Sequence, residues 1–289
     1  MARQLGIRAN TAFKITNQLG ANCKSFVQVA SELRPQWSGS LLVDGKTIYV
    51  GKRKYALLLT ADAKTQDIPC ANLFESENLE NYFSLLQAVR DTLSYPIKGV
   101  TVDGDPGLVS ATQAAFPGAP LQLCVRHVDE FHVHYFKYLY EGPVKGITRF
   151  LELTHRLLYA KSLRHLNHLI QEYLACRDDL IEAGLGKEIK NFERKFDYLW
   201  THLKHPGMPR TTNIIESIIR QLSRKIDRTD GFRSTETAWN SLKLLIMKYR
   251  FHTFTCSRIK GHNGHSPLSL AKAKNKSIDW ITFSQKMQH

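Results

Sequence analysis

Three acidic residues lie at positions from which they could jointly bind divalent cations. Asp44 follows the apolar run 40–43, Asp103 follows the apolar run 99–102, and Glu216 lies in a segment with helical spacing. Hard cations such as Mg²⁺ prefer carboxylate oxygens as ligands and keep positions open for phosphate oxygens. Carboxylates that meet from two strands and a helix would hold two Mg²⁺ (or Mn²⁺) ions. The three acids therefore indicate phosphoryl transfer on a nucleic acid.

Each acid also has a purely structural interpretation. Asp44 with the following glycine suits a tight hairpin turn, and Asn213-x-x-Glu216 resembles a helix capping box. The segment around Asp103 is rich in turn residues, so either Asp103 or Asp105 could be the ligand. We favour Asp103 because it directly follows the apolar run. Three accidental turns would not be expected to coincide with two strand ends and a helix, so we expect the acids to form one site.

The charge of the chain agrees with a nucleic-acid partner. It has 40 Lys and Arg against 26 Asp and Glu, a formal net charge of +14 and a pI of about 9.6. Residues 220–289 hold 14 basic and 4 acidic residues, a net +10. Excess positive charge attracts the phosphate backbone of double-stranded DNA, although a solvated basic surface without function has the same composition. The expected DNA-binding residues of this region are Arg220, Arg224, Lys225, Arg228 and Arg233.

Composition and length indicate a globular protein. Hydrophobic residues make up 43% of 289 residues, which is enough for a large core. We find no apolar stretch long enough to span a membrane and no apolar segment of a signal peptide at the start. The five cysteines are scattered without a C-x-x-C pair, so we expect no disulfide framework and a cytoplasmic location.

Residues 1–36 resemble part of a helix-turn-helix. Gly6 provides a turn, and a second helix with apolar residues near helical spacing begins at about Arg8. Only five residues precede Gly6, so the first helix of a complete motif is missing. The expected DNA-binding residues of this segment are Arg8, Asn10, Thr11 and Lys14.

The rest of the chain reads as an α/β core interrupted by helices. We expect strands at 41–43, 55–60, 68–74, 100–102 and 121–125, with helices at 78–93 and 107–116. This order, βββαβαβ within residues 37–130, is that of an RNase H-like fold with a mixed sheet. We expect an all-α insertion at 131–207, the last core helix with Glu216 at 208–255, and a basic C-terminal tail at 256–289.

Five motifs in order resemble those of DDE transposases of the mutator type, a group that includes prokaryotic insertion-sequence transposases and mutator-like elements. They contain Asp44, Asp103 (five residues before Leu108), Phe116-Pro-Gly, Cys124-Val-Arg-His127 and Thr212-Asn-Ile-Ile-Glu216. The resemblance implies that the three acids bind the metals and that a C-x-x-H pair and a helical insertion lie between the last two acids. It also implies DNA cleavage and strand transfer at the ends of a mobile element. A homo-oligomer would join the two ends.

The residues expected to support the acids are Cys124, His127 and Asn213. Cys124 and His127, with His132 and His134 nearby, also admit a zinc site. A structural zinc site needs a second well-spaced pair, so we prefer that Cys124 and His127 close the fifth strand beside the acids. Two alternative functions stay open: a catalytically silent DNA-binding protein derived from a transposase, and an RNase H-like nuclease without strand transfer.

Overall fold

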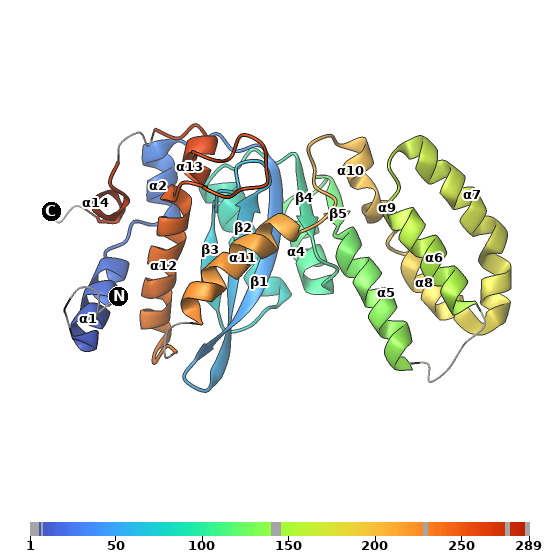
Figure 1. Ribbon diagram of the computed structural model, residues 1–289, viewed down its shortest axis with the longest axis horizontal. Coiled ribbons are helices and arrows are strands. Elements are labelled where there is room, and N and C mark those ends of the chain that lie inside the picture. Colours follow the sequence, from blue (N-terminus) through green and yellow to red (C-terminus); the bar gives the residue numbers. More distant parts are fainter. Residues whose placement is uncertain (1–5, 7, 140–145, 228–230, 275–277, 287–289) are drawn as a thin grey trace.

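A five-stranded mixed sheet forms the centre of the protein. The computed structural model describes residues 6, 8–139, 146–227, 231–274 and 278–286. Figure 1 shows the sheet between two groups of helices, one formed by the two ends of the chain and the other by the middle of the chain. No described helix is both long and apolar enough to cross a membrane.

The strands follow one another in a mixed topology. They are β1 (Ser40–Val50), β2 (Arg53–Asp62), β3 (Ala71–Phe74), β4 (Gly99–Val102) and β5 (Leu121–Leu123), in the order β3-β2-β1-β4-β5. Strands β1, β2 and β3 pair antiparallel, whereas β4 pairs parallel to both β1 and β5. Helix α3 (Leu79–Gln87), with a π-helical turn at Ala88–Thr92, precedes β4, and α4 (Pro106–Ala115) precedes β5. The order of three strands, helix, strand, helix and strand expected from the sequence is therefore observed.

The two faces of the sheet are covered by different helices. Leu41 and Val43 of β1 are buried in a cluster with residues of α3 and α4. Leu42 is buried on the opposite face with Ile215 and Ile218 of α11 (Asn213–Ile226). Side chains alternate along a strand, so Asp44 is on the same face as Leu42. This alternation directs Asp44 toward the helix that carries the third acid.

Asp44 does not end its strand as the sequence suggested. Strand β1 continues to Val50 and pairs with β2 along this whole stretch, with Asp44 opposite Leu59. The turn is Gly51–Lys52, where Gly51 has a φ of +59° that favours glycine. The interpretation of Asp44 and Gly45 as a hairpin turn is therefore wrong. The apolar pattern resumes at Ile48, which is buried in the α11 cluster.

Two other expected boundaries also move. The strand expected at 68–74 forms only at Ala71–Phe74. The strand expected at 121–125 ends at Leu123, and α5 (Val125–Leu139) follows immediately. Cys124 thus lies between strand and helix, and His127 lies in the first turn of α5 instead of closing the strand. The expected start of the insertion at residue 131 falls inside α5.

Between residues 131 and 207 the elements that the structure describes are all helices, joined by short turns. After α5 come α6 (Ile147–Leu158), α7 (Leu163–Leu180), a π-helical turn at Ile181–Leu185, α8 (Gly186–Glu193), α9 (Phe196–Leu199) and α10 (Thr201–Lys204). Phe150, Leu157 and Phe192 are fully buried in its core. Gly184, with a φ of +92°, breaks the run between α7 and α8. Figure 1 places these helices beyond β5.

The two ends of the chain pack together around α12 (Thr235–Phe251). They supply α1 (Ala9–Ala21), α2 (Phe26–Leu33), α13 (Pro267–Leu270) and α14 (Trp280–Ser284). Cys23 forms a β-bridge with Gln285, and α1 approaches α12 so closely that a Cβ on Gly20 would lie 2.3 Å from the carbonyl oxygen of Asn240. The segment expected as a basic tail at 256–289 therefore contributes to a packed helical layer over the residues described.

Candidate active site

Asp44 projects from the middle of β1 toward α11. Its side chain is half-buried, and Oδ1 accepts the backbone N–H of Gly45 at 2.8 Å. Strand β1 is held there by β2 on one side, while β4 pairs with β1 only through Ser40–Leu42. Asp44 therefore lies where β4 has already ended, so the strand edge beside it is open.

Asp103 follows the end of β4, next to β1. Thr101, two residues earlier, is on the α11 side of the sheet, where its hydroxyl donates to the carbonyl of Pro209 at 2.9 Å. Asp103 is half-buried and Oδ1 accepts the backbone N–H of Asp105 at 3.1 Å. Asp105 is exposed and its own carboxylate accepts the N–H of Leu108 at 2.9 Å, which caps α4. The cap gives Asp105 a structural role and leaves Asp103 available.

Glu216 lies in the first turn of α11 and is not part of a capping box. Thr212 is the N-cap residue without a side-chain cap, and its hydroxyl donates to Glu216 Oε1 at 2.8 Å. Asn213 is exposed as the first residue of the helix. The guanidinium of Arg126 donates to Glu216 Oε2 and also contacts Glu130 at 3.1 Å. Arg126 is a site residue that sequence reasoning missed, because a contact across 90 positions leaves no local pattern.

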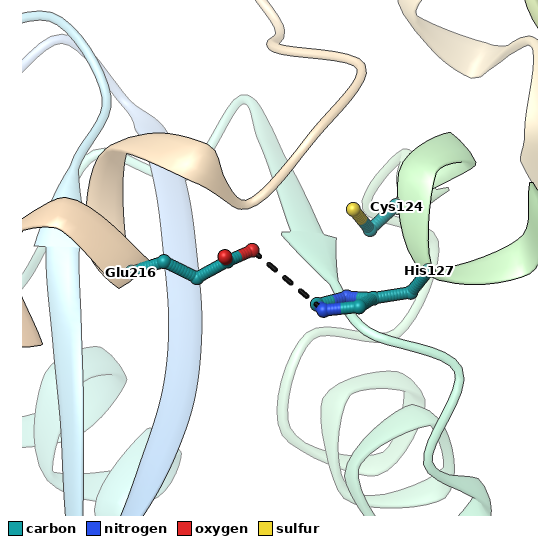
Figure 2. Close-up of side chains that lie close together, drawn as sticks. All are labelled: Cys124, His127 and Glu216. Atoms are coloured by element: carbon teal, nitrogen blue, oxygen red, sulfur yellow. Dashed lines mark ion pairs between the residues drawn. The ribbon is translucent and has the colours of Figure 1, made fainter. Parts of the chain in front are cut away.

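Cys124 and His127 point toward Glu216 from the other side of the site (Figure 2). Nε2 of His127 lies 3.7 Å from Oε1 of Glu216, and the backbone N–H of Thr212 donates to Sγ of Cys124 at 3.4 Å. In the described part of the chain these three side chains are the one group of three or more His, Cys, Asp or Glu residues whose ligand atoms all lie within 4.8 Å of one another, and the group includes neither Asp44 nor Asp103. The pair expected beside the acids is therefore in contact with the third acid.

The additional histidines expected for a zinc site do not join this group. His132 is buried in the core of the helical insertion, with its ring 5.6 Å from that of Phe150 and 5.2 Å from that of Phe192. Burial lowers the pKa of His132 to about 4, so it is neutral at physiological pH. His134 is exposed. The described residues thus offer no second ligand pair for a structural zinc ion.

The pKa values of Asp44 and Asp103 are both raised, and neighbouring negative charges contribute to each shift. Burial, together with the negative charges of Asp103 and Glu216, raises the pKa of Asp44 to about 7, although the hydrogen bond from Gly45 and the nearby His127 act in the opposite direction. Burial likewise raises the pKa of Asp103, with further contributions from Asp105 and Glu216. Such shifts mean that the ionised acids repel one another and lack compensation.

Glu216 and the Cys124–His127 pair are compensated differently. Burial by itself would raise the pKa of Glu216, but hydrogen bonds from Arg126 and Thr212 and the nearby positive charges lower it. The hydrogen bond to Cys124 raises the pKa of His127 to about 9 in spite of partial burial. Burial would raise the pKa of the Cys124 thiol, but the hydrogen bonds from His127 and Thr212 lower it. His127 is therefore positively charged at neutral pH and faces a carboxylate.

The donor set suits a hard divalent cation. The ion pairs between described residues include neither Asp44 nor Asp103, and burial is the main cause of the raised pKa of each. A divalent ion bound by both carboxylates would remove the repulsion between them, and oxygen ligands are those that Mg²⁺ prefers. The residues present therefore fit the metal that the acids suggested.

The residues expected to bind DNA lie on two separate parts of the surface. Those on α11 and before α12 are all exposed: Arg220, Arg224, Lys225 and Arg233. Arg228 lies outside the described residues. The N-terminal set is exposed on and before α1: Arg8, Asn10, Thr11 and Lys14. Figure 1 shows α12 between α1 and the sheet, whereas Arg220, Arg224 and Lys225 share α11 with Glu216.

The sequence matches a family of known proteins. Residues 50–253 match the model of the family described as Transposase, Mutator family. The match covers more than half of the 289 residues, and the chain belongs to this family. The resemblance inferred from the motifs is confirmed. Asp103 and Glu216 lie inside the matched range, whereas Asp44 lies six positions before it.

One solved structure is weakly similar to the chain. A solved structure that matches the chain is the cryo-EM structure of a simian T-cell lymphotropic virus intasome in complex with PP2A regulatory subunit B56 gamma. The identity is 14% and the TM-score 0.25, and the match covers 44% of this chain and 51% of that chain. No curated protein sequence matches. The family match therefore stands without support from these two comparisons.

Proposed function

We propose that the protein is a DDE transposase, which cleaves DNA at the ends of a mobile element and joins those ends to target DNA. The observation that supports the proposal is that Asp44, Asp103 and Glu216 come from neighbouring elements, β1, the end of β4 and α11, and that Asp103 and Glu216 both contribute to the raised pKa of Asp44. Among the described residues, neither Asp44 nor Asp103 forms an ion pair. Membership of the Mutator family supports it. The strand order and the helix α11 on the opposite face from α3 fit an RNase H-like core.

Asp44, Asp103 and Glu216 would hold two Mg²⁺ or Mn²⁺ ions. When bound, such ions polarise the phosphoryl group and lower the pKa of bound water, so that an oxygen nucleophile is available at neutral pH. The protein positions the three carboxylates on β1, after β4 and on α11, elements whose packing fixes their relative places. His127, charged at neutral pH, offers an N–H near Glu216 with which to stabilise negative charge on a phosphate.

Glu216 has to exchange its partner when it binds a cation. Arg126, which now donates to Glu216, also contacts Glu130 at 3.1 Å and keeps that partner after the exchange. The released guanidinium would then be free to donate to a phosphate oxygen of the DNA. The proposed partners are double-stranded DNA, as element ends and as target, and further copies of the chain that bring the two ends together.

Single substitutions test the assignment. A plasmid carrying the DNA that flanks the gene on both sides is incubated with Mg²⁺ and each of Asp44→Ala, Asp103→Ala and Glu216→Ala. We expect cleavage to fall by about a thousandfold or more in each variant, because each loses a metal ligand that contributes several kcal/mol. DNA binding should stay largely intact. Cleavage at the wild-type rate in all three variants would refute the proposal.

Asp105→Ala is the matched control. Asp105 is only two positions from Asp103 but caps α4, so its loss should cost about 1 kcal/mol of stability and leave cleavage unchanged. If Asp105→Ala abolishes cleavage and Asp103→Ala does not, the ligand was assigned to the wrong residue.

Pre-cut ends separate the proposed function from its alternatives. A transposase joins a pre-cut end with a free 3′-hydroxyl to a second DNA molecule, and the joined product migrates as a larger species. A nuclease without strand transfer cleaves the plasmid but forms no joined product. A catalytically silent DNA-binding protein does neither, although it retains affinity for DNA.

A further inference from the structure

The hairpin of β1 and β2 extends beyond the rest of the sheet. Strand β1 pairs with β4 only through Ser40–Leu42, and β2 pairs with β3 only from Ala56 onward. Figure 1 shows the turn of this hairpin projecting past its neighbours. One contact braces the tip, where the N–H of Gly51 donates to the carbonyl of Phe232 at 2.7 Å. Residues 46–55 therefore form a projection that is braced on one face, where Ile48 and Val50 are buried in the α11 cluster, and exposed elsewhere.

This projection carries an excess of positive charge. Its exposed basic residues are Lys46, Lys52, Arg53 and Lys54. No Asp or Glu occurs between Asp44 and Asp62 in the sequence, and the ion pairs between described residues include none of the four. Asp227, which directly follows α11, lines the same cleft as Lys46, but the four basic side chains outnumber it and attract a polyanion such as DNA.

The charge begins beside the proposed metal ligands. Lys46 is two residues after Asp44 on the same strand, so both side chains are on the same face, about 6.6 Å apart along the strand. Lys46 and Ile48 also line a cleft of about 250 Å³ between β1 and the end of α11, together with Ser223 and Phe232. A phosphate next to one held at Asp44 would therefore lie within reach of the flexible Lys46 side chain.

The projection also exposes an aromatic ring. Tyr49 is 58% exposed and lies opposite Lys54 in the pairing of β1 with β2. Because side chains alternate along a strand, Tyr49 and Lys54 are on the opposite face of the hairpin from Asp44 and Lys46, so DNA that contacts all of them has to pass around the tip. Exposed aromatic rings beside basic residues are a common platform for stacking on nucleic-acid bases.

We propose that the β1–β2 hairpin is a DNA-binding finger that holds the strand leading out of the acidic site. Lys46 contacts the phosphate next to the one being cleaved, Lys52, Arg53 and Lys54 contact the backbone further along, and Tyr49 stacks on an unpaired base. This proposal deepens the proposed function and rests on it. It adds a second surface to the basic residues of α11.

The first test measures binding without catalysis. The triple variant Lys52→Ala, Arg53→Ala, Lys54→Ala is compared with wild type by fluorescence anisotropy on a labelled duplex of mixed sequence, about 40 base pairs long, in EDTA. We expect affinity to fall by about tenfold or more and the slope of log K against log salt to become shallower by about 2.7, that is 0.9 for each lost phosphate contact. Unchanged affinity and slope would overturn the proposal.

A matched variant controls for total charge. Lys161→Ala, Arg164→Ala, Lys187→Ala removes three basic residues that are equally exposed but lie in the helical insertion. We expect its affinity to remain within about threefold of wild type. If it binds DNA as weakly as the hairpin variant does, general charge and not the hairpin holds the DNA, and the proposal fails. Matching melting temperatures of both variants and wild type exclude unfolding.

Tyr49→Ala and Tyr49→Phe test the stacking contact. On a duplex with a short single-stranded end we expect Tyr49→Ala to bind about tenfold more weakly, whereas Tyr49→Phe, which keeps the ring, binds like wild type. On the same duplex with both ends closed by loops, all three should bind alike. Equal binding of Tyr49→Ala and wild type to the single-stranded end would disprove stacking.

Failure of this inference and failure of the proposed function give different results. Wild-type protein that binds DNA through the hairpin but never cleaves it with Mg²⁺ refutes the transposase proposal alone. Hairpin variants that bind normally while wild type cleaves with Mg²⁺ refute the DNA-binding finger alone.

Discussion

Two pairs of aspartates on the same sheet have opposite surroundings. Asp62 at the end of β2 and Asp67 shortly after it are both fully buried. Asp62 accepts five hydrogen bonds, from the backbone N–H and the hydroxyl of Ser38 and Thr65 and from the hydroxyl of Tyr95. Asp67 accepts hydrogen bonds from the indole of Trp37 and twice from the guanidinium of Arg250. Asp44 and Asp103 are less buried, yet each accepts one backbone N–H from a residue close in sequence.

The number of hydrogen-bond donors around each carboxylate separates two structural aspartates, Asp62 and Asp67, from Asp44 and Asp103, which we propose as metal ligands. A buried carboxylate is tolerated when donors surround it, and Asp62 and Asp67 meet this condition within the protein. Asp44 and Asp103 each accept a single hydrogen bond, and their pKa values rise because burial and nearby negative charges outweigh that hydrogen bond and the charge of His127. Neighbouring carboxylates with few hydrogen-bond donors and raised pKa values are typical of cation-binding and catalytic sites.

The largest effect on stability should come from removing the buried ion pair between Arg250 and Asp67. Arg250 and Asp67 form an ion pair at 2.7 Å with both side chains 0% exposed. Arg250→Met leaves the carboxylate of Asp67 buried without its cation, so we expect a loss of about 3–5 kcal/mol in the free energy of unfolding. Urea denaturation measures it. Lys248→Met, an exposed change on the same helix, should stay within about 0.5 kcal/mol of wild type.

The double variant Arg250→Met, Asp67→Asn sharpens this prediction. It removes both charges, so it should recover part of the stability lost in Arg250→Met. A single variant Arg250→Met as stable as wild type would show that the ion pair does not support the fold.

Much of the fold was predictable because its signals are local. Alternating and helical spacing of apolar residues marked the strands, α3, α4 and the buried stripe of α11, where Ile215, Ile218, Ile219 and Leu222 are buried as expected. The motif order also located the family without reference to structure. These signals depend on neighbours within about ten positions of one another.

The remainder depends on contacts between distant parts of the chain. Strand β1 runs on past Asp44 in its pairing with β2, and its tip contacts Phe232, more than 180 positions away. The partnership of Arg126 with Glu216 and that of Asp67 with Arg250 join residues that no spacing rule connects. The helices of the two chain ends were likewise assigned separately, although Cys23 and Gln285 bridge them. The assignment of the three acids as metal ligands therefore stays a prediction from the sequence, whereas the partners that the structure gives to Glu216 and Asp67 could not be predicted from it.

The pH dependence of stability should show that Asp44 has a raised pKa in the folded protein. Asp44 has a pKa of about 7 in the folded protein, above the ordinary value of 3.8. The unfolded chain therefore releases this proton first, and the metal-free protein loses stability as the pH rises from about 4 to about 7. Asp44→Asn removes this contribution, so it should melt higher than wild type in EDTA at about pH 8. Thermal melting across this pH window measures both.

Adding Mg²⁺ completes this test. Binding to the ionised carboxylates should raise the melting temperature of wild type above about pH 7 and have a smaller effect on Asp44→Asn. Parallel pH profiles of the two proteins in EDTA would contradict the claim that Asp44 is an uncompensated acid.

The smallest expected effect concerns Glu216, the one acid of the three that already has a cationic partner. Arg126 is 31% exposed and Glu216 20% exposed, so their ion pair should contribute about 1 kcal/mol or less. Arg126→Gln removes this competitor, and we expect Mn²⁺ to bind about two- to fivefold more tightly in isothermal titration calorimetry. Glu130→Gln is the control, because it removes the other partner of Arg126 and leaves the contact with Glu216 intact; its Mn²⁺ affinity should not rise. Weaker Mn²⁺ binding by Arg126→Gln would mean that Arg126 positions Glu216 for the metal instead of competing with it. Glu216 would then resemble Asp62 and Asp67 in having its charge compensated within the protein, and this would leave Asp44 and Asp103 as the two acids of the proposed site without an ion pair between described residues.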